Sequence, residues 1–191
     1  MGTQQRYFPL RWLSKLAYTA ETLFLFTRSD YKTILFPVVR WSRSIVHCGS
    51  ELTTHQTMFA SATAPIHSFE SWLKMLFWIW THLLQANVSN QTHSANEDIV
   101  NKPWRPLPAG RVTERQAAIL RWSLVVANLA LSATIGQQVM YVSAALALVE
   151  FVHDDMGLSH HPVLKNVCNI GGYGTFQAGA TLILCMPFRF F

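Results

Sequence analysis

The sequence predicts an all-α protein, a polytopic transmembrane helical bundle of about four to five helices. Half of its 191 residues are hydrophobic and only 13% are charged, whereas roughly a quarter of the residues in a soluble domain are charged. Residues 122–149 and 166–188 contain no charged side chain, and each run exceeds the roughly 20 residues that one membrane span needs. Too few charges remain to cover a soluble surface.

The N-terminal segment, residues 1–70, is expected to hold one uncertain membrane helix. Leu23–Val39 is largely apolar, but three charged side chains lie inside it: Arg28, Asp30 and Lys32. Each charge at the centre of a bilayer costs on the order of 3 kcal/mol on insertion scales. No clean helix is therefore expected here, and residues 49–70 are expected to form a surface loop.

The remaining helices are expected within residues 71–191. Segment 71–86 carries three tryptophans among Leu, Ile, Phe and Met, which is typical of a membrane helix with aromatic anchors. A Gly-Gln-Gln sequence at 136–138 interrupts the longest apolar run, and it predicts two antiparallel helices that begin near Thr113 and end near Phe151. Four glycines within the last apolar run permit the close helix approach of membrane bundles.

Residues 87–115 carry the candidate chemistry. If the preceding helix continues past Ala86, a step of 100° per residue places six oxygen-bearing side chains in one arc: Asn87, Asn90, Ser94, Glu97, Asp98 and Asn101. Mg²⁺ prefers oxygen ligands and shares one or two carboxylates with a substrate phosphate. Fixed cations that follow would hold diphosphate oxygens: Lys102, Arg105 and Arg111. The alternative is a solvated loop whose basic residues follow the positive-inside rule.

Other polar groups are weaker candidates. The net charge of +5 comes from basic residues beside apolar helices, so a membrane surface or a phosphorylated lipid is expected rather than nucleic acid. The three cysteines lack metal-ligand spacing and are expected as reduced thiols. His153-Asp154-Asp155 with His160-His161 is interpreted as a polar turn in preference to a metal site. His82 is expected to be packed or hydrogen-bonded rather than a haem ligand.

A run of motifs in this region resembles the first aspartate-rich region of the UbiA superfamily of membrane prenyltransferases. It consists of Asn90-Gln91, Glu97-Asp98 and the segment 101–111, NKPWRPLPAGR, whose ending RPLPAGR is the most specific part. The resemblance continues through Glu150, Gly157-Leu158, Lys165-Asn166, Asn169, Gly172-Tyr173 and the segment 176–181. It covers about residues 70–186 and is nearest to the fungal branch that includes sesquiterpene cyclases.

The resemblance implies a partial UbiA-like fold over residues 71–191 and an enzyme that ionises a prenyl diphosphate, farnesyl or geranylgeranyl, with Mg²⁺. Asn90, Glu97 and Asp98 would carry the metal, with Glu97 and Asp98 as catalytic acids. Lys102 and Arg105 would bind the diphosphate. A multi-pass protein of the endoplasmic reticulum is expected, with the basic loop 102–115 on the cytosolic side.

Two departures from the family pattern keep alternatives open. Ser94 stands at the middle position of the usual Asn and Asp spacing, and the chain reaches Phe191 before a second acidic motif. A truncated chain that retains part of the fold without turnover is the alternative to an enzyme. For an enzyme, transfer of the prenyl group to an acceptor and cyclisation of the prenyl chain both remain open.

Overall fold

The structure of the protein, a computed structural model, describes residues 8–52 and 69–185. These residues form seven α-helices with a π-helical turn and a 3₁₀ turn between them, and no strand occurs in these two ranges. In chain order they are α1 (Phe8–Thr27), η1 (Tyr31–Leu35), α2 (Phe36–Leu52), α3 (Phe69–His93), α4 (Ala95–Asn101), α5 (Glu114–Ile135), α6 (Gln137–Asp154), η2 (Leu158–His160) and α7 (Pro162–Cys185). The predicted all-α class is confirmed, with more helices than the four to five expected.

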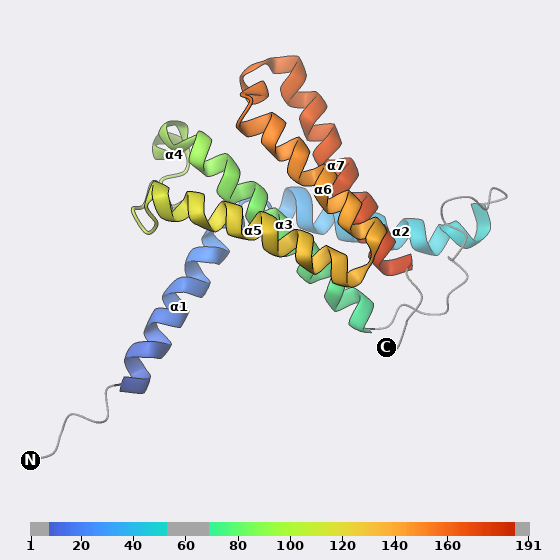
Figure 1. The fold of residues 1–191 in the computed structure, drawn as a ribbon, viewed down its shortest axis with the longest axis horizontal. Coiled ribbons are helices and arrows are strands. Elements are labelled where there is room, and N and C mark those ends of the chain that lie inside the picture. The colour runs from blue at the N-terminus through green and yellow to red at the C-terminus, as the bar shows by residue number, and fades with distance from the viewer. Residues whose placement is uncertain (1–7, 53–68, 186–191) are drawn as a thin grey trace, which may run out of the picture.

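Helix α3 lies at the centre of the arrangement (Figure 1). It packs against α5 and α7, while α6 packs along α7 and against α5. Helix α2 lies against α7, and α1 contacts α3 and extends away from the bundle (Figure 1). Residues of α3 therefore meet side chains from most of the other elements.

Helices α5 and α6 form the predicted antiparallel pair. Thr113 caps α5 in a reciprocal arrangement, in which its Oγ1 accepts from the Gln116 amide at 3.2 Å and its own amide donates to Gln116 Oε1 at 2.9 Å. Such a capping box satisfies backbone donors that no helical partner reaches. Gly136 separates the two helices as expected, and α6 ends at Asp154, slightly beyond the predicted Phe151.

The N-terminal third differs in part from its prediction. No single helix crosses residues 23–39, because α1 ends at Thr27 and a turn leads into η1. The loop expected at 49–70 is wrong at both ends: residues 49–52 complete α2, and α3 begins at Phe69. Residues 53–68 lie outside the described residues.

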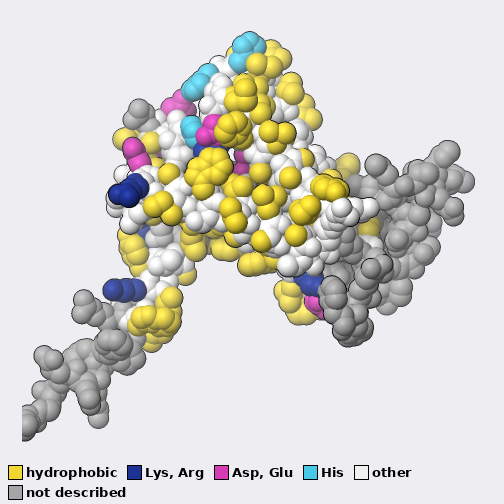
Figure 2. Space-filling view, viewed as in Figure 1, with side chains coloured by type: hydrophobic (Ala, Val, Ile, Leu, Met, Phe, Trp, Pro, Cys, Tyr) yellow, Lys and Arg dark blue, Asp and Glu magenta, His cyan; other side chains and the backbone are white. Residues whose placement is uncertain are grey.

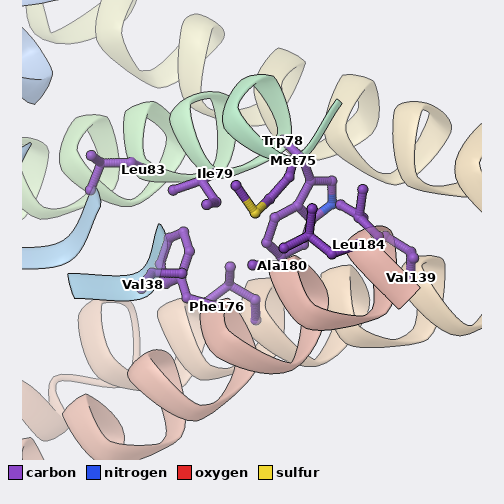
Figure 3. Packing of buried hydrophobic residues seen from close by; sticks show 11 residues of the cluster. Val38, Met75, Trp78, Ile79, Leu83, Val139, Phe176, Ala180 and Leu184 are labelled. Atoms are coloured by element: carbon purple, nitrogen blue, oxygen red, sulfur yellow. The ribbon is translucent and has the colours of Figure 1, made fainter. Parts of the chain in front are cut away.

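The apolar core lies where α3 crosses α7 and α2 (Figure 3). Met75 and Trp78 of α3 face Phe176 and Ala180 of α7, and the Trp78 and Phe176 rings meet edge to face with centroids 6.2 Å apart. A Cβ at Gly179 would overlap the six-membered ring of Trp78. This glycine therefore permits the close contact of the two helices.

On α5, α6 and α7 many apolar side chains face outward and polar side chains face inward, which is the opposite of the arrangement in a soluble protein. Large apolar side chains face outward, among them Ile119, Trp122, Val126, Tyr141, Leu148, Val163, Val167 and Ile170. Polar side chains are buried on their inner sides, among them Asn128 and Ser132 of α5 and Ser143 of α6, which lie with His82 and Gln85 of α3 in the buried interior. Within the described ranges one helix, Glu114–Ile135, is long and apolar enough to cross a membrane by length and composition. Large exposed apolar surfaces mark sites of contact with a membrane or a partner.

Candidate active site at the polar end of the bundle

A cavity of about 310 Å³ lies between the C-terminal half of α3, the segment after α4, the end of α6 and the middle of α7. Its polar lining consists of Asp30, Asn87, Asn90, Lys102, Arg105, Glu150, His153, Asp154 and Asn169. Its apolar wall consists of Ile34, Ala86, Leu83, Leu146, Val149, Cys168 and Phe176. Figure 2 shows acidic and histidine side chains gathered toward the upper left of an otherwise largely hydrophobic face.

Two buried amide side chains, Asn128 and Gln85, form a row of hydrogen bonds that ends at Glu150 of the cavity lining. Asn128 Nδ2 of α5 donates to Gln85 Oε1 of α3 at 2.8 Å, and Gln85 Nε2 donates to Glu150 Oε2 of α6 at 2.7 Å. Because Gln85 accepts at Oε1 and donates at Nε2, its orientation is fixed and it holds Glu150 Oε2 in place. Burying these groups costs little when all of them are paired. The second carboxylate oxygen of Glu150, Oε1, is buried and has no hydrogen-bond partner within residues 8–52 and 69–185.

A buried ion pair forms the basic wall. Arg105 Nη1 donates to Asp98 Oδ2 at 2.6 Å, and the two side chains are 5% and 7% exposed. Lys102 caps α4, its backbone amide donating to the Asp98 carbonyl at 2.8 Å, and its side chain lines the cavity. Asp98 therefore holds Arg105 in place, and the two basic residues Lys102 and Arg105 both belong to the cavity lining.

Helix α6 contributes the acidic residues Glu150 and Asp154 to the cavity lining. Asp154 Oδ1 pairs with His153 Nδ1 at 2.7 Å, and Ser89 Oγ donates to Asp154 Oδ2. Just beyond the helix, Asp155 accepts two hydrogen bonds from Arg121, one of them 2.9 Å long. These bonds from the Arg121 guanidinium hold the pKa of Asp155 below its usual range. The buried Arg121 also balances the negative charge of this wall.

Five buried polar atoms of the cavity have no hydrogen-bond partner among the described residues. They are Asp30 Oδ2, Asn87 Nδ2, Arg105 Nε, Glu150 Oε1 and His153 Nε2. Buried polar groups in native proteins are nearly always paired, so each exception calls for an explanation. A set of such atoms around one cavity indicates a space for a polar ligand or ordered water.

The predicted site residues occupy different environments. Asn90, Lys102 and Arg105 line the cavity, and Asp98 is buried against Arg105. Arg111 instead pairs with Glu21 at 2.7 Å, and its guanidinium lies 4.4 Å from the centroid of the Tyr18 ring. It thereby links the loop to α1.

The single arc expected for residues 87–101 is wrong, because the helix breaks at Ser94. Ser94 Oγ donates to the Asn90 carbonyl at 2.9 Å, and α4 starts with the next residue. A serine that bonds back to its own helix competes with the regular backbone ladder. After the break, the Glu97 side chain is exposed while Asp98 points inward.

The donor chemistry of the cavity fits Mg²⁺ bound together with a phosphate rather than a metal held by protein alone. Among the described residues, no group of three or more His, Cys, Asp or Glu side chains is placed to hold a metal ion. Mg²⁺ is usually held by one or two carboxylates, waters and substrate phosphates, with oxygen as the ligand atom. Asn90, whose amide oxygen accepts from Ser94 Oγ at 3.2 Å, lines the same cavity as Lys102 and Arg105.

The structure is an all-helical bundle in which helices with apolar outer faces surround a polar cavity. Sequence comparison shows the family to which this bundle belongs. The chain belongs to the UbiA prenyltransferase family, whose model matches residues 52–186. The predicted family is confirmed. No solved structure matches the chain.

Three curated relatives support the family. The chain is 29% identical over 170 residues to the fumagillin beta-trans-bergamotene synthase of Aspergillus fumigatus, a match covering 85% of this chain and 50% of that protein. It is 38% identical over 58 residues to a diterpene cyclase of Hericium erinaceus, covering 30% of this chain and 19% of the relative. It is 37% identical over 54 residues to a digeranylgeranylglyceryl phosphate synthase of Korarchaeum cryptofilum, covering 28% and 19%. The chain spans about half the length of the first of these relatives.

Sequence reasoning missed part of the cavity. Glu150 was named only as part of the family resemblance, and His153 and Asp154 were interpreted as part of a polar turn. All three residues line the cavity. Their spacing contained a signal, because residues three and four apart share one face of a helix. Asp30, on the turn between α1 and η1, had no comparable signal, since only the tertiary structure brings it to the cavity.

Proposed function

We propose that this chain is a membrane-embedded UbiA-like protein that binds a prenyl diphosphate with Mg²⁺ and ionises it. The observation that carries the proposal is one cavity with two cationic side chains at one wall and apolar side chains along another. A prenyl diphosphate has the same division between a charged head and a hydrocarbon chain. The family match and the names of the relatives support this substrate class.

Lys102 and Arg105 are proposed to bind the diphosphate oxygens. Arg105 has an unpartnered buried Nε, so it can donate to a ligand while Asp98 keeps its other end fixed. A preorganised guanidinium stabilises the charge that develops on a leaving group. Asn90 and Asp98 would hold Mg²⁺ on this side, and Mg²⁺ supplies further charge neutralisation when it is bound.

Glu97 and Arg111 have less direct parts in this proposal. Glu97 is exposed at the start of α4, on the same short helix as Asp98, and is proposed as a ligand only if α4 rotates when the metal binds. Arg111 is proposed to contribute to diphosphate binding from the loop, and its pair with Glu21 would have to open for direct contact.

The surroundings of the cavity support a location in the bilayer. Apolar side chains face outward on α5, α6 and α7, and α5 has the length and composition of a membrane span. A multi-pass protein of the endoplasmic reticulum, with the cavity open to the cytosolic side, is proposed on this basis. The ionised prenyl group would then meet either an acceptor or its own double bonds, which distinguishes transfer from cyclisation.

The test incubates microsomes that contain the chain with farnesyl or geranylgeranyl diphosphate and Mg²⁺, and measures released diphosphate and organic products. Arg105→Met should lower diphosphate release about 100-fold, because the loss of one preorganised donor at a developing charge costs about that much. Arg115→Gln is the matched control, since it removes one positive charge from an exposed position on α5 outside the cavity.

Three outcomes separate the alternatives. Loss of activity in Arg105→Met, with denaturant unfolding in micelles showing that this variant is folded, and normal activity in Arg115→Gln together support the proposal. No diphosphate release by the native chain would favour a non-catalytic membrane protein. Equal diphosphate release from the native chain and both variants would show that the reaction does not take place in this cavity.

A further inference from the structure

His153 and Asp154 of α6 form a hydrogen-bonded dyad among the residues that line the cavity. His153 Nδ1 lies 2.7 Å from Asp154 Oδ1, and the other carboxylate oxygen accepts from Ser89 Oγ of α3. The two side chains are 14% and 5% exposed. Both oxygens of the carboxylate are therefore engaged, and the imidazole is held from one side only.

The pairing determines which ring nitrogen of His153 carries the proton. A carboxylate only accepts hydrogen bonds, so Nδ1 must be the protonated nitrogen when it faces Asp154. The neutral imidazole then has a bare lone pair at Nε2. That atom is buried, has no partner among the described residues, and belongs to a side chain that lines the cavity.

Other polar groups around the cavity leave Nε2 available. Glu150 Oε2 is occupied by Gln85, and the adjacent Asp155 is occupied by Arg121 with His93 at 3.7 Å from it. Asp30 and Asn87 also line the cavity, on the η1 and α3 sides. The cationic side chains Lys102 and Arg105 come from the segment after α4, so the basic imidazole and the diphosphate-binding side chains belong to different walls.

We propose that His153 is a catalytic base that removes the proton lost by the product carbocation, with Asp154 as its positioning residue; this rests on the proposed function. The Nε2 lone pair forms the new N–H bond, and the electron pair of the broken C–H bond forms a carbon–carbon double bond that neutralises the cation. The resulting imidazolium is held against the Asp154 carboxylate. It later returns its proton to released diphosphate or to water.

This step serves both forms of the reaction. A cyclised prenyl cation and the cation formed when a prenyl group adds to an aromatic or olefinic acceptor each end by losing a proton. A carboxylate that orients an imidazole and stabilises its charged form is an established arrangement for proton transfer. The histidine therefore acts after ionisation.

The experiment compares native chain, His153→Gln and Asp154→Asn in the microsomal assay, measuring diphosphate release and product composition separately. In His153→Gln we expect diphosphate release to persist, because the cationic wall is intact, while the normal deprotonated product falls about 100-fold. Alcohols from water capture or isomeric alkenes should replace it. Asp154→Asn should shift the products in the same direction. His160→Gln is the matched control, because its exposed imidazole lies on η2 outside the cavity.

A second measurement uses the folded chain without turnover. Nitrogen-15 NMR of the histidine-labelled chain in micelles and mildly alkaline buffer should show His153 protonated at Nδ1 and bare at Nε2, and Asp154→Asn should change that signal. A proton on Nε2 would overturn the dyad, as would an unchanged product profile in an active His153→Gln protein. If the native chain releases no diphosphate, the proposed function fails and the base fails with it.

Discussion

The two halves of helix α3 bury different kinds of side chain. The apolar half, Phe69–Leu83, places Met75, Trp78 and Ile79 against α7 and α2 (Figure 3). The polar half, Leu84–His93, buries Gln85, Asn87, Ser89 and Gln91 instead. The polar half is the more enclosed of the two. Hydrogen bonds from Gln85 and Ser89 to α6 hold the polar half, whereas close packing holds the apolar half.

This difference shows where the fold tolerates change. Close packing fails when volume changes, since interiors have almost no free space. A polar network fails when one partner is lost and the other stays buried without water. The polar half also reaches the cavity, where Asn87 and Asn90 belong to the lining.

The largest expected effect is at the polar end. Asp98→Ala leaves the buried Arg105 guanidinium without its ion pair, which should lower the free energy of unfolding by about 3–5 kcal/mol. Denaturant unfolding of the chain in detergent micelles measures the change. The double variant Asp98→Ala with Arg105→Met should recover most of the loss, because no unpaired charge remains buried.

Glu97→Ala is the matched control for this change. Its side chain is exposed on the same short helix, so the free energy of unfolding should change by less than about 0.5 kcal/mol. Equal effects of Asp98→Ala and Glu97→Ala would show that the ion pair does not stabilise this end.

The apolar end should respond to volume rather than to charge. Gly179→Ala places a methyl group into the ring of Trp78, and overpacking should cost about 1–3 kcal/mol of unfolding free energy. Gly174→Ala, on the same helix, meets nothing within 4 Å. It should be neutral or stabilising by about 0.5–1 kcal/mol, and a similar loss in both variants would contradict the close contact at Trp78.

The smallest expected effect is a dependence on pH confined to the polar end. Arg121 lowers the pKa of Asp155, so this pair stabilises the folded chain above the usual Asp range and its contribution disappears as pH falls through the lowered pKa. Asp155→Asn should cost about 1 kcal/mol near neutral pH. The difference from the native chain should shrink on acidification, as measured by thermal unfolding in micelles at several pH values. A constant difference would contradict the pair.

The helices were predictable where one local signal dominated. The absence of charge in 122–149 with glycine at 136 predicted α5, the turn and α6. The break after α1 was anticipated from the charges at residues 28–32. The helical ends at 49–52 and 69–70 were not, because polar composition there resembles a loop while backbone hydrogen bonding continues.

The candidate site was predicted in part. Asn90, Lys102 and Arg105 line one cavity, whereas Arg111 faces Glu21 of α1; their roles in binding stay a prediction. Ser94 separates α3 from α4, and on α4 the Glu97 side chain is exposed while Asp98 is buried. Helical periodicity assumes an unbroken helix, so it could not foresee the change of direction.

Composition, apolar run length and the NKPWRPLPAGR motif by themselves determined the all-helical class and the family, because these properties depend only on neighbours along the chain. Tertiary structure alone decided which polar groups meet. Glu150 faces Gln85 and Asp154 faces Ser89, each 65 positions apart in the chain. Such pairs depend on how α3 and α6 cross, and helix crossing is set by the packing of whole side-chain surfaces rather than by local sequence.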